Sequence, residues 1–221
     1  EIMSSDWSSD VCSSDLVETM GHNVGWLALG AGISGGADVI LIPEIPYNIE
    51  YVAESILSRY RNGKRFSIVA VAEGAMTIED HKKLQELYHQ KEATEDSKDK
   101  KEIKAKIKAF YSSRTDHTIQ FAHQLEALTN LESRVTILGH LQRGGTPSAA
   151  DRLLASRLGT AAANEILNNS YGNMIAVKSE SLLPIAVESV AGIKKYVPLD
   201  HQWVDTARKL GTCLGDAKLT F

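Results

Sequence analysis

Cysteine is scarce in this sequence of 221 residues, and no long hydrophobic run is present. The two cysteines, Cys12 and Cys213, cannot form a disulfide framework, so we expect a reducing, cytoplasmic environment. The longest apolar runs, such as residues 39–43, are far shorter than the roughly 20 residues of a membrane-spanning helix. The first residues show neither the basic nor the apolar region of a secretory signal, and we expect none.

The sequence also lacks an excess of positive charge. Its formal net charge is −4, which excludes the basic surface typical of nucleic-acid-binding proteins. Four of the 28 acidic residues lie in residues 1–16, which hold no lysine or arginine, so the remainder is formally neutral. A composition of 43% hydrophobic and 24% charged residues is ordinary for a globular protein of one or two domains.

Residues 3–16 are of low complexity, because the triplet Ser-Ser-Asp occurs three times within them. This segment has no helical or strand periodicity, and we expect it not to pack. One interpretation is translated foreign DNA joined to a gene fragment, and the alternative is a natural serine-rich tail. We assign residues 1–15 to a non-native segment and residues 16–221 to the C-terminal part of one domain, with a charged helical insertion at about residues 77–130.

The stretch from Ile137 to Ser148 has the pattern of a ligand-binding loop. The β-rich run over residues 135–138 predicts a buried strand, and residues 149–167 predict a long helix. His140, Gln142 and Arg143 lie between them, at a strand end where open α/β sheets bind ligands. Arginine can hold a phosphate with two hydrogen bonds, and histidine adds a hydrogen bond or a charge. The alternative is a helix-capping loop whose arginine pairs with a carboxylate.

Two other loops have a similar character. Residues 66–72 form a continuous apolar run, typical of a strand covered on both faces of a parallel sheet, and Glu73 follows directly. The loop Met20-Gly21-His22 contains a glycine that permits close approach of a ligand. Between these loops and the first lies a charged helical insertion, about residues 77–130. Residues 91–108 are dense in charge, and we interpret them as solvated, with pairs such as Glu102–Lys106. A later amphipathic stripe is expected in the core: Ile119, Ala122, Leu125 and Leu128. A partner-binding role for this insertion is the alternative.

Three separated blocks resemble one family. They are residues 138–147 with residues 151–159 (Leu-Gly-His-Leu-Gln-Arg-Gly-Gly-Thr-Pro and Asp-Arg-Leu-Leu-Ala-Ser-Arg-Leu-Gly), residues 18–26 (Glu-Thr-Met-Gly-His-Asn-Val-Gly-Trp) and residues 68–74 (Ile-Val-Ala-Val-Ala-Glu-Gly). The blocks, and their order along the chain, are similar to those of the phosphofructokinases. The resemblance implies an α/β fold, a three-layer αβα arrangement around a parallel sheet. It also implies that this is the C-terminal, sugar-phosphate-binding half and that the N-terminal half is missing.

The resemblance assigns substrate-binding residues. It implies contacts with fructose 6-phosphate for a set of loop residues: Met20, Gly21, His22, Glu73, His140, Gln142 and Arg143. The family has an arginine at the position of His22, where it neutralises the transferred phosphoryl group. A transition-state contact and an ordinary surface histidine are therefore both open for His22. Arg134 corresponds to an arginine that reaches the neighbouring subunit's site, which implies a homodimer or homotetramer; the alternative is a surface arginine.

The resemblance further implies phosphoryl transfer from ATP or pyrophosphate, with Mg²⁺, to fructose 6-phosphate. The family's base, the aspartate of a Thr-Ile-Asp motif, and its glycine-rich donor loops are not found in this sequence. We therefore predict that the chain is inactive alone, with no catalytic residue or metal ligand of its own apart from the open role of His22. The alternative is a non-catalytic half-protein that binds sugar phosphates. We expect no nucleic-acid or membrane partner.

Overall fold

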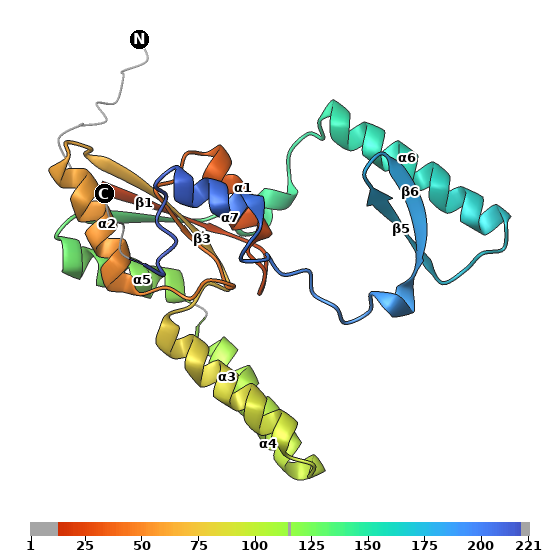
Figure 1. Cartoon of the computed structure of the whole chain (residues 1–221), viewed down its shortest axis with the longest axis horizontal. Coiled ribbons are helices and arrows are strands. Elements are labelled where there is room, and N and C mark those ends of the chain that lie inside the picture. Colours follow the sequence, from red (N-terminus) through yellow and green to blue (C-terminus); the bar gives the residue numbers. More distant parts are fainter. Residues whose placement is uncertain (1–12, 115, 218–221) are drawn as a thin grey trace. The chain divides into compact units, whose positions relative to one another are not determined.

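The computed structural model describes residues 13–114 and 116–217 (Figure 1). The chain divides into two compact units, which are described separately. The first comprises residues 1–142 and 196–221, and the second comprises residues 143–195. None of the helices in the described residues is both long and apolar enough to cross a membrane.

A parallel sheet of four strands forms the centre of the first unit. Its strands are β1 (Ser13–Thr19), β2 (Val39–Leu41), β3 (Phe66–Ala72) and β4 (Glu132–Ile137), in the order β2-β3-β1-β4. Leu16 of β1 lies opposite Val69 and Val135, and both Leu16 and Val69 are fully buried. The predicted α/β fold with a parallel sheet is confirmed, and the apolar run of residues 66–72 is β3 as expected.

Helices cover the two faces of this sheet. Helix α1 (Trp26–Ser34) packs beside α7 (Gln202–Lys209), and α2 (Ile49–Arg61) packs beside α5 (His117–Thr129) (Figure 1). Parallel strands are joined by right-handed crossovers. Because the chain runs one way across the sheet from β1 to β2 and the other way from β2 to β3 and β4, α1 lies on one face while α2 and α5 lie on the other. Three layers result.

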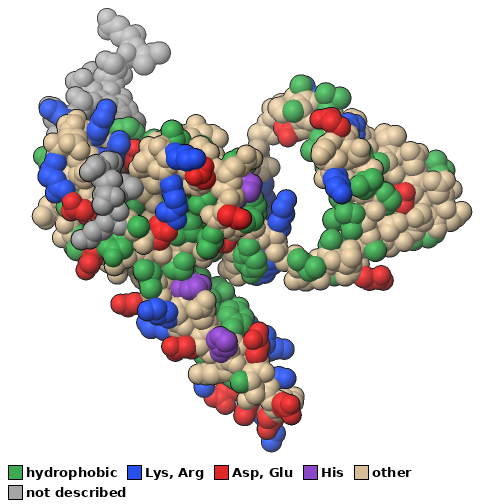
Figure 2. All heavy atoms as spheres, viewed as in Figure 1, with side chains coloured by type: hydrophobic (Ala, Val, Ile, Leu, Met, Phe, Trp, Pro, Cys, Tyr) green, Lys and Arg blue, Asp and Glu red, His purple; other side chains and the backbone are tan. Residues whose placement is uncertain are grey.

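The insertion forms two long helices. Helices α3 (Ile78–Ala93) and α4 (Ser97–Ser112) run side by side and project away from the sheet (Figure 1). Acidic and basic side chains both cover this hairpin (Figure 2), and the expected Glu102–Lys106 pair forms at 2.9 Å. Only Leu84 and Ile103 are buried in these two helices, which is why the sequence there is so rich in charge.

Two expectations about the strands were wrong. We expected no packed structure before Leu16, but β1 begins at Ser13, and Ser14 is fully buried. Residues 13–15 pair through their backbones with β3 on one side and with β4 on the other, and this pairing does not depend on their side chains. We also expected residues 135–138 to be buried, but Ile137 is 48% exposed. Within the described sheet β4 is an edge strand that pairs with β1 alone. Residues 1–12 lie outside the described part of the chain.

The second unit consists of α6 (Ala149–Leu167), the antiparallel strands β5 (Asn173–Lys178) and β6 (Ser181–Ala186), and the short helix η2 (Val187–Ser189). Ser148 and Asp151 form a reciprocal capping box at the start of α6. No residue described in this unit is buried, and large apolar side chains such as Leu153, Leu167 and Ile193 are more than half exposed. The unit therefore has no hydrophobic core of its own.

Candidate functional site

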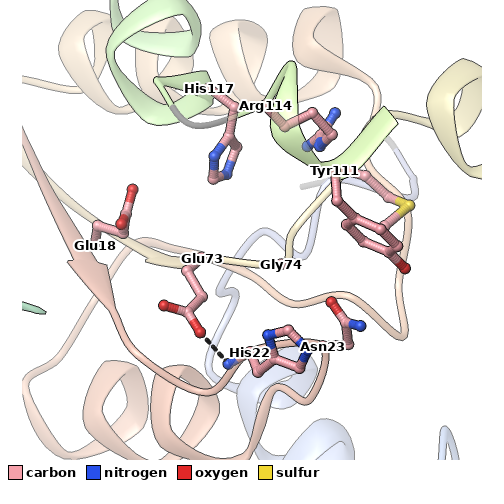
Figure 3. A pocket seen from close by; sticks show the side chains of 9 residues that line it. Glu18, His22, Asn23, Glu73, Gly74, Tyr111, Arg114 and His117 are labelled. Atoms are coloured by element: carbon pink, nitrogen blue, oxygen red, sulfur yellow. Dashed lines mark hydrogen bonds between the residues drawn. The ribbon is translucent and has the colours of Figure 1, made fainter. Parts of the chain in front are cut away.

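The carboxyl ends of β1 and β3 form a topological switch point. The two strands are neighbours in the sheet, but the helices packed after them, α1 and α5, lie on opposite faces. Such a point leaves a crevice where ligands bind in open α/β sheets. Here it is a cavity of about 310 Å³, which we call the β1–β3 cavity. Its lining comprises Glu18, His22, Asn23, Glu73, Gly74, Met76, Tyr111, Arg114 and His117 (Figure 3).

The loops that follow β1 and β3 are bonded to each other. The backbone N–H of His22 donates a hydrogen bond to Oε1 of Glu73 (Figure 3), and the N–H of Glu73 donates to the carbonyl of Thr19 at 3.0 Å. His22 has a left-handed backbone with φ of 55°, a conformation uncommon outside glycine. The two residues that the sequence singled out in different blocks thus share one cavity.

Glycine at residue 74 allows this close approach. A Cβ atom at this position would lie 2.2 Å from the carbonyl oxygen of His22, which is inside van der Waals contact. A glycine is equally required at residue 21, where φ is 152° and a Cβ would lie 2.5 Å from the carbonyl oxygen of Val24. Both glycines belong to the blocks that identify the family resemblance.

The loop after β4 reaches the same edge of the sheet. Gln142 lies in the short helix η1 (Gly139–Arg143), and its Oε1 accepts a hydrogen bond of 2.6 Å from the backbone N–H of Met20. The N–H of Leu138 donates to the carbonyl of Glu18 at 3.2 Å. The structure therefore brings together five of the predicted site residues: Met20, Gly21, His22, Glu73 and Gln142. Their role in sugar binding remains a prediction.

Two predicted residues, His140 and Arg134, lie apart from this group, and a third belongs to the other unit. His140 is exposed in η1, and no hydrogen bond links it to the β1 loop among the described residues. Arg134 is exposed on β4, where its guanidinium pairs with Glu132 at 3.1 and 3.3 Å. Arg143 belongs to the second unit, which is described by itself.

The end of the insertion supplies site residues that the sequence analysis missed. Thr118 donates a hydrogen bond from its hydroxyl to Oε2 of Glu18, and Nε2 of His117 lies 3.4 Å from the same hydroxyl oxygen. Arg114 forms an ion pair with Asp80 and donates to the carbonyl of Ala75 at 2.6 Å. The sequence offers little signal for the contacts of Thr118 with Glu18 and of Arg114 with Asp80 and Ala75, because each joins residues far apart in the chain.

His117 is held neutral by its surroundings. Burial and the positive charge of Arg114 lower its pKa to about 4. A backbone hydrogen bond to Arg114 and the charges of Glu73 and Asp80 act in the opposite direction but are outweighed. At neutral pH the imidazole therefore carries no charge and has one donor and one acceptor nitrogen.

The charges around the β1–β3 cavity favour hydroxyl groups over a phosphate. Glu18 and Glu73 each use one carboxylate oxygen within the protein, and the other oxygen of each has no partner among the described residues. Carboxylates accept hydrogen bonds from hydroxyls and repel a phosphate dianion. The lining cation, Arg114, is already paired with Asp80. In the residues that the structure describes, no group of three His, Cys, Asp or Glu side chains could hold a metal ion.

Comparison with known proteins agrees with this arrangement. Residues 2–166 match the family model described as Phosphofructokinase. The chain belongs to the phosphofructokinase family. It is 47% identical over 204 residues to the ATP-dependent 6-phosphofructokinase of Propionibacterium freudenreichii, a match that covers 91% of this chain and 54% of that protein. It is 45% identical over 201 residues to the enzyme of the same name from Spirochaeta thermophila, covering 91% and 50%.

The chain thus spans about half the length of the curated phosphofructokinases it matches. Among solved structures, the phosphofructokinase of Saccharomyces cerevisiae matches with a TM-score of 0.54 and 28% identity, covering 82% of this chain and 21% of that one. The pyrophosphate-dependent phosphofructokinase of Marinobacter aquaeolei matches with a TM-score of 0.61, covering 96% and 50%. At 19% identity, the second likeness concerns the fold alone.

Proposed function

We propose that the intact protein transfers a phosphoryl group to O1 of fructose 6-phosphate, giving fructose 1,6-bisphosphate. In this proposal the present chain carries the sugar-phosphate-binding part of the enzyme. The observation that supports it best is the meeting of Met20, His22, Glu73 and Gln142 at the ends of three adjacent parallel strands. The curated relatives, named ATP-dependent 6-phosphofructokinases, support the reaction.

In this proposal the acidic residue binds the sugar hydroxyls and the basic residues bind the phosphate. The carboxylate of Glu73 accepts hydrogen bonds from sugar hydroxyls, and the close backbone at Gly21 admits the sugar ring. His140 and Arg143 bind the 6-phosphate, where arginine's paired donors match phosphate oxygens. His22 donates a hydrogen bond to the transferred phosphoryl group.

The phosphoryl donor is ATP or pyrophosphate in this proposal. The names of the curated relatives favour ATP. Mg²⁺ accompanies the donor and neutralises its charge, as phosphoryl transfer generally requires. The described residues assemble no set of metal ligands, so we derive no step through the ion from this chain. In this proposal its ligands, the donor loops and the catalytic base lie in a part of the intact protein outside this chain.

The chain alone is therefore expected to bind the sugar phosphate without turnover. Loss of a general base costs about 10²- to 10⁴-fold in rate, and loss of donor positioning costs more. Isothermal titration of the purified chain with fructose 6-phosphate tests binding, and a coupled assay with ATP or pyrophosphate tests turnover. Saturable binding that Glu73→Gln weakens, while free fructose binds poorly, supports the proposal. A folded chain without affinity for fructose 6-phosphate would overturn it.

A non-catalytic half-protein that senses sugar phosphates is the second candidate. It is favoured by the assembly of five predicted site residues within this one chain. Both candidates predict binding, so sequencing of the gene upstream of Leu16 separates them. A reading frame that continues into a Thr-Ile-Asp motif supports the enzyme, and a genuine start codon near Met3 or Met20 supports the half-protein.

The assembly of the enzyme is also proposed rather than observed. We propose a cytoplasmic homodimer or homotetramer in which Arg134 holds the 6-phosphate in the neighbouring subunit. The exposure of Arg134 supports this role, because its bond to Glu132 is a surface contact that a ligand could replace. In the full-length protein, Arg134→Ala should weaken binding of fructose 6-phosphate but not of free fructose.

A further inference from the structure

His117 is a buried polar residue that the function proposed above does not use. It is the first residue of α5 and is 8% exposed. Its side chain points into the β1–β3 cavity, above Glu73 and to one side of Glu18 (Figure 3). It reaches this position from the end of the charged helical insertion.

The position of His117 is fixed from both sides. On one side, its backbone N–H donates to the carbonyl of Arg114 at 3.1 Å, and Arg114 is bonded to Ala75, two residues after Glu73. On the other side, Thr118 is bonded to Glu18. These bonds fix the backbone around His117, and Nε2 of its imidazole lies 3.4 Å from the Thr118 hydroxyl that bonds Glu18.

The imidazole complements the two carboxylates chemically. Ionised carboxylates only accept hydrogen bonds, whereas each sugar hydroxyl has both a proton to donate and lone pairs to accept with. A neutral imidazole has one donor and one acceptor nitrogen, so it can form a hydrogen bond with a sugar hydroxyl without attracting phosphate. A protonated ring would instead be repelled by the adjacent Arg114.

We propose that His117 is a further sugar-binding residue that hydrogen-bonds a ring hydroxyl of the sugar phosphate beside Glu73. This inference rests on the proposed function, since it takes fructose 6-phosphate as the ligand. It assigns the insertion a second role: its carboxyl end completes the wall of the site. The competing view is that His117 only stabilises the start of α5.

The test compares His117→Leu with His117→Gln in the full 221-residue chain. Leucine keeps the buried volume but removes both nitrogens, so fructose 6-phosphate should bind about threefold to tenfold more weakly. Glutamine restores an amide donor and acceptor and should recover most of that loss. His123 lies on the same helix with its side chain 74% exposed, so His123→Leu is the matched control and should bind as the unmodified chain does.

Hydroxyl specificity distinguishes a binding role from a structural one. Tagatose 6-phosphate and psicose 6-phosphate each invert one ring hydroxyl of fructose 6-phosphate. If His117 binds one of these hydroxyls, the preference of the chain for fructose 6-phosphate over the matching epimer should shrink in His117→Leu. A helix-stabilising role alone would lower the melting temperature and leave this preference unchanged.

The outcomes separate the inference from the proposed function. If the unmodified chain does not bind fructose 6-phosphate, the proposed function fails first. If it binds, and Glu73→Gln weakens binding while His117→Leu has unchanged affinity and epimer preference, only the inference is wrong. Should His117→Leu fail to fold by circular dichroism, the epimer preference of His117→Ala, which also removes both nitrogens, decides: a preference equal to that of the unmodified chain overturns the inference.

Discussion

The backbone N–H of Met20 donates a hydrogen bond of 2.6 Å to Oε1 of Gln142, across 122 residues of sequence. This contact joins the loop after β1 to the loop after β4, while the bond from His22 to Glu73 joins the β1 loop to the β3 loop. The β1 loop is thus held on both sides by polar side chains. The geometry of the β1 loop therefore depends on the hydrogen-bond acceptors of Glu73 and Gln142.

Gln142→Leu should loosen the β1 loop and weaken binding of fructose 6-phosphate. Leucine has a similar size but no acceptor, so the Met20 N–H loses its partner at a part-buried position. The expected loss of affinity is about threefold to tenfold, the range of one neutral hydrogen bond. Isothermal titration measures it, with the exposed Gln120→Leu as control. Unchanged affinity in Gln142→Leu would show that the loop is ordered without this bond.

Arg114 should contribute far more to stability than its neighbour Lys83, although both pair with Asp80. The Arg114 side chain is 15% exposed and also bonds the Ala75 carbonyl, whereas Lys83 is 66% exposed and lies 3.7 Å from Asp80. Arg114→Met should lower the free energy of unfolding by about 2–3 kcal/mol, and Lys83→Met by less than about 0.5 kcal/mol. Urea denaturation of both variants checks this, and equal effects would contradict it.

Ser14→Val should stabilise the fold. Ser14 is fully buried in β1, and its hydroxyl has no hydrogen-bond partner among the described residues. Valine removes that unpaired group and suits a strand, so we expect about 1 kcal/mol of added stability. Ser67 lies opposite in β3, but its hydroxyl accepts a hydrogen bond from Arg59. Ser67→Val should therefore bring no gain, and a similar gain in both variants would refute the assignment.

Stability should fall between pH 6.5 and pH 4 because of His117. The histidine takes up a proton near pH 6.5 in the unfolded chain but only near pH 4 in the folded one. The unfolded state thus binds more protons in this interval, which costs the folded state up to about 3 kcal/mol by pH 4. Glu73 and Asp80 also influence the pKa of His117. Both carboxylates are present in His117→Leu and in the unmodified chain, so a comparison of these two proteins removes their own contribution.

The difference in unfolding free energy between these two proteins at pH 7 and at pH 4 isolates the effect of His117. His117→Leu should be relatively more stable at pH 4 than at pH 7. His123→Leu, at an exposed position on the same helix, should show no such change. A pH-independent difference for His117→Leu would mean that the imidazole titrates alike in both states.

Several elements were predictable because their signals are local. The expected helix over residues 149–167 is α6, the apolar run of residues 66–72 is β3, and the expected pair of Glu102 and Lys106 forms within α4. Hydrophobic periods and i,i+4 pairs involve residues a few positions apart, so the sequence records them directly. The same holds for the placement of Glu73 and His140 just after strands.

Other features depend on contacts that local patterns do not record. The sequence by itself determined which strands and helices form and which polar residues follow the strands. Only the tertiary structure decided that β4 is an edge strand in the described sheet, that Ser14 is buried, and that His117 reaches the cavity of Glu73. These outcomes follow from strand order and from side-chain bonds such as Thr118 to Glu18, which span 100 residues and leave no periodicity in the sequence.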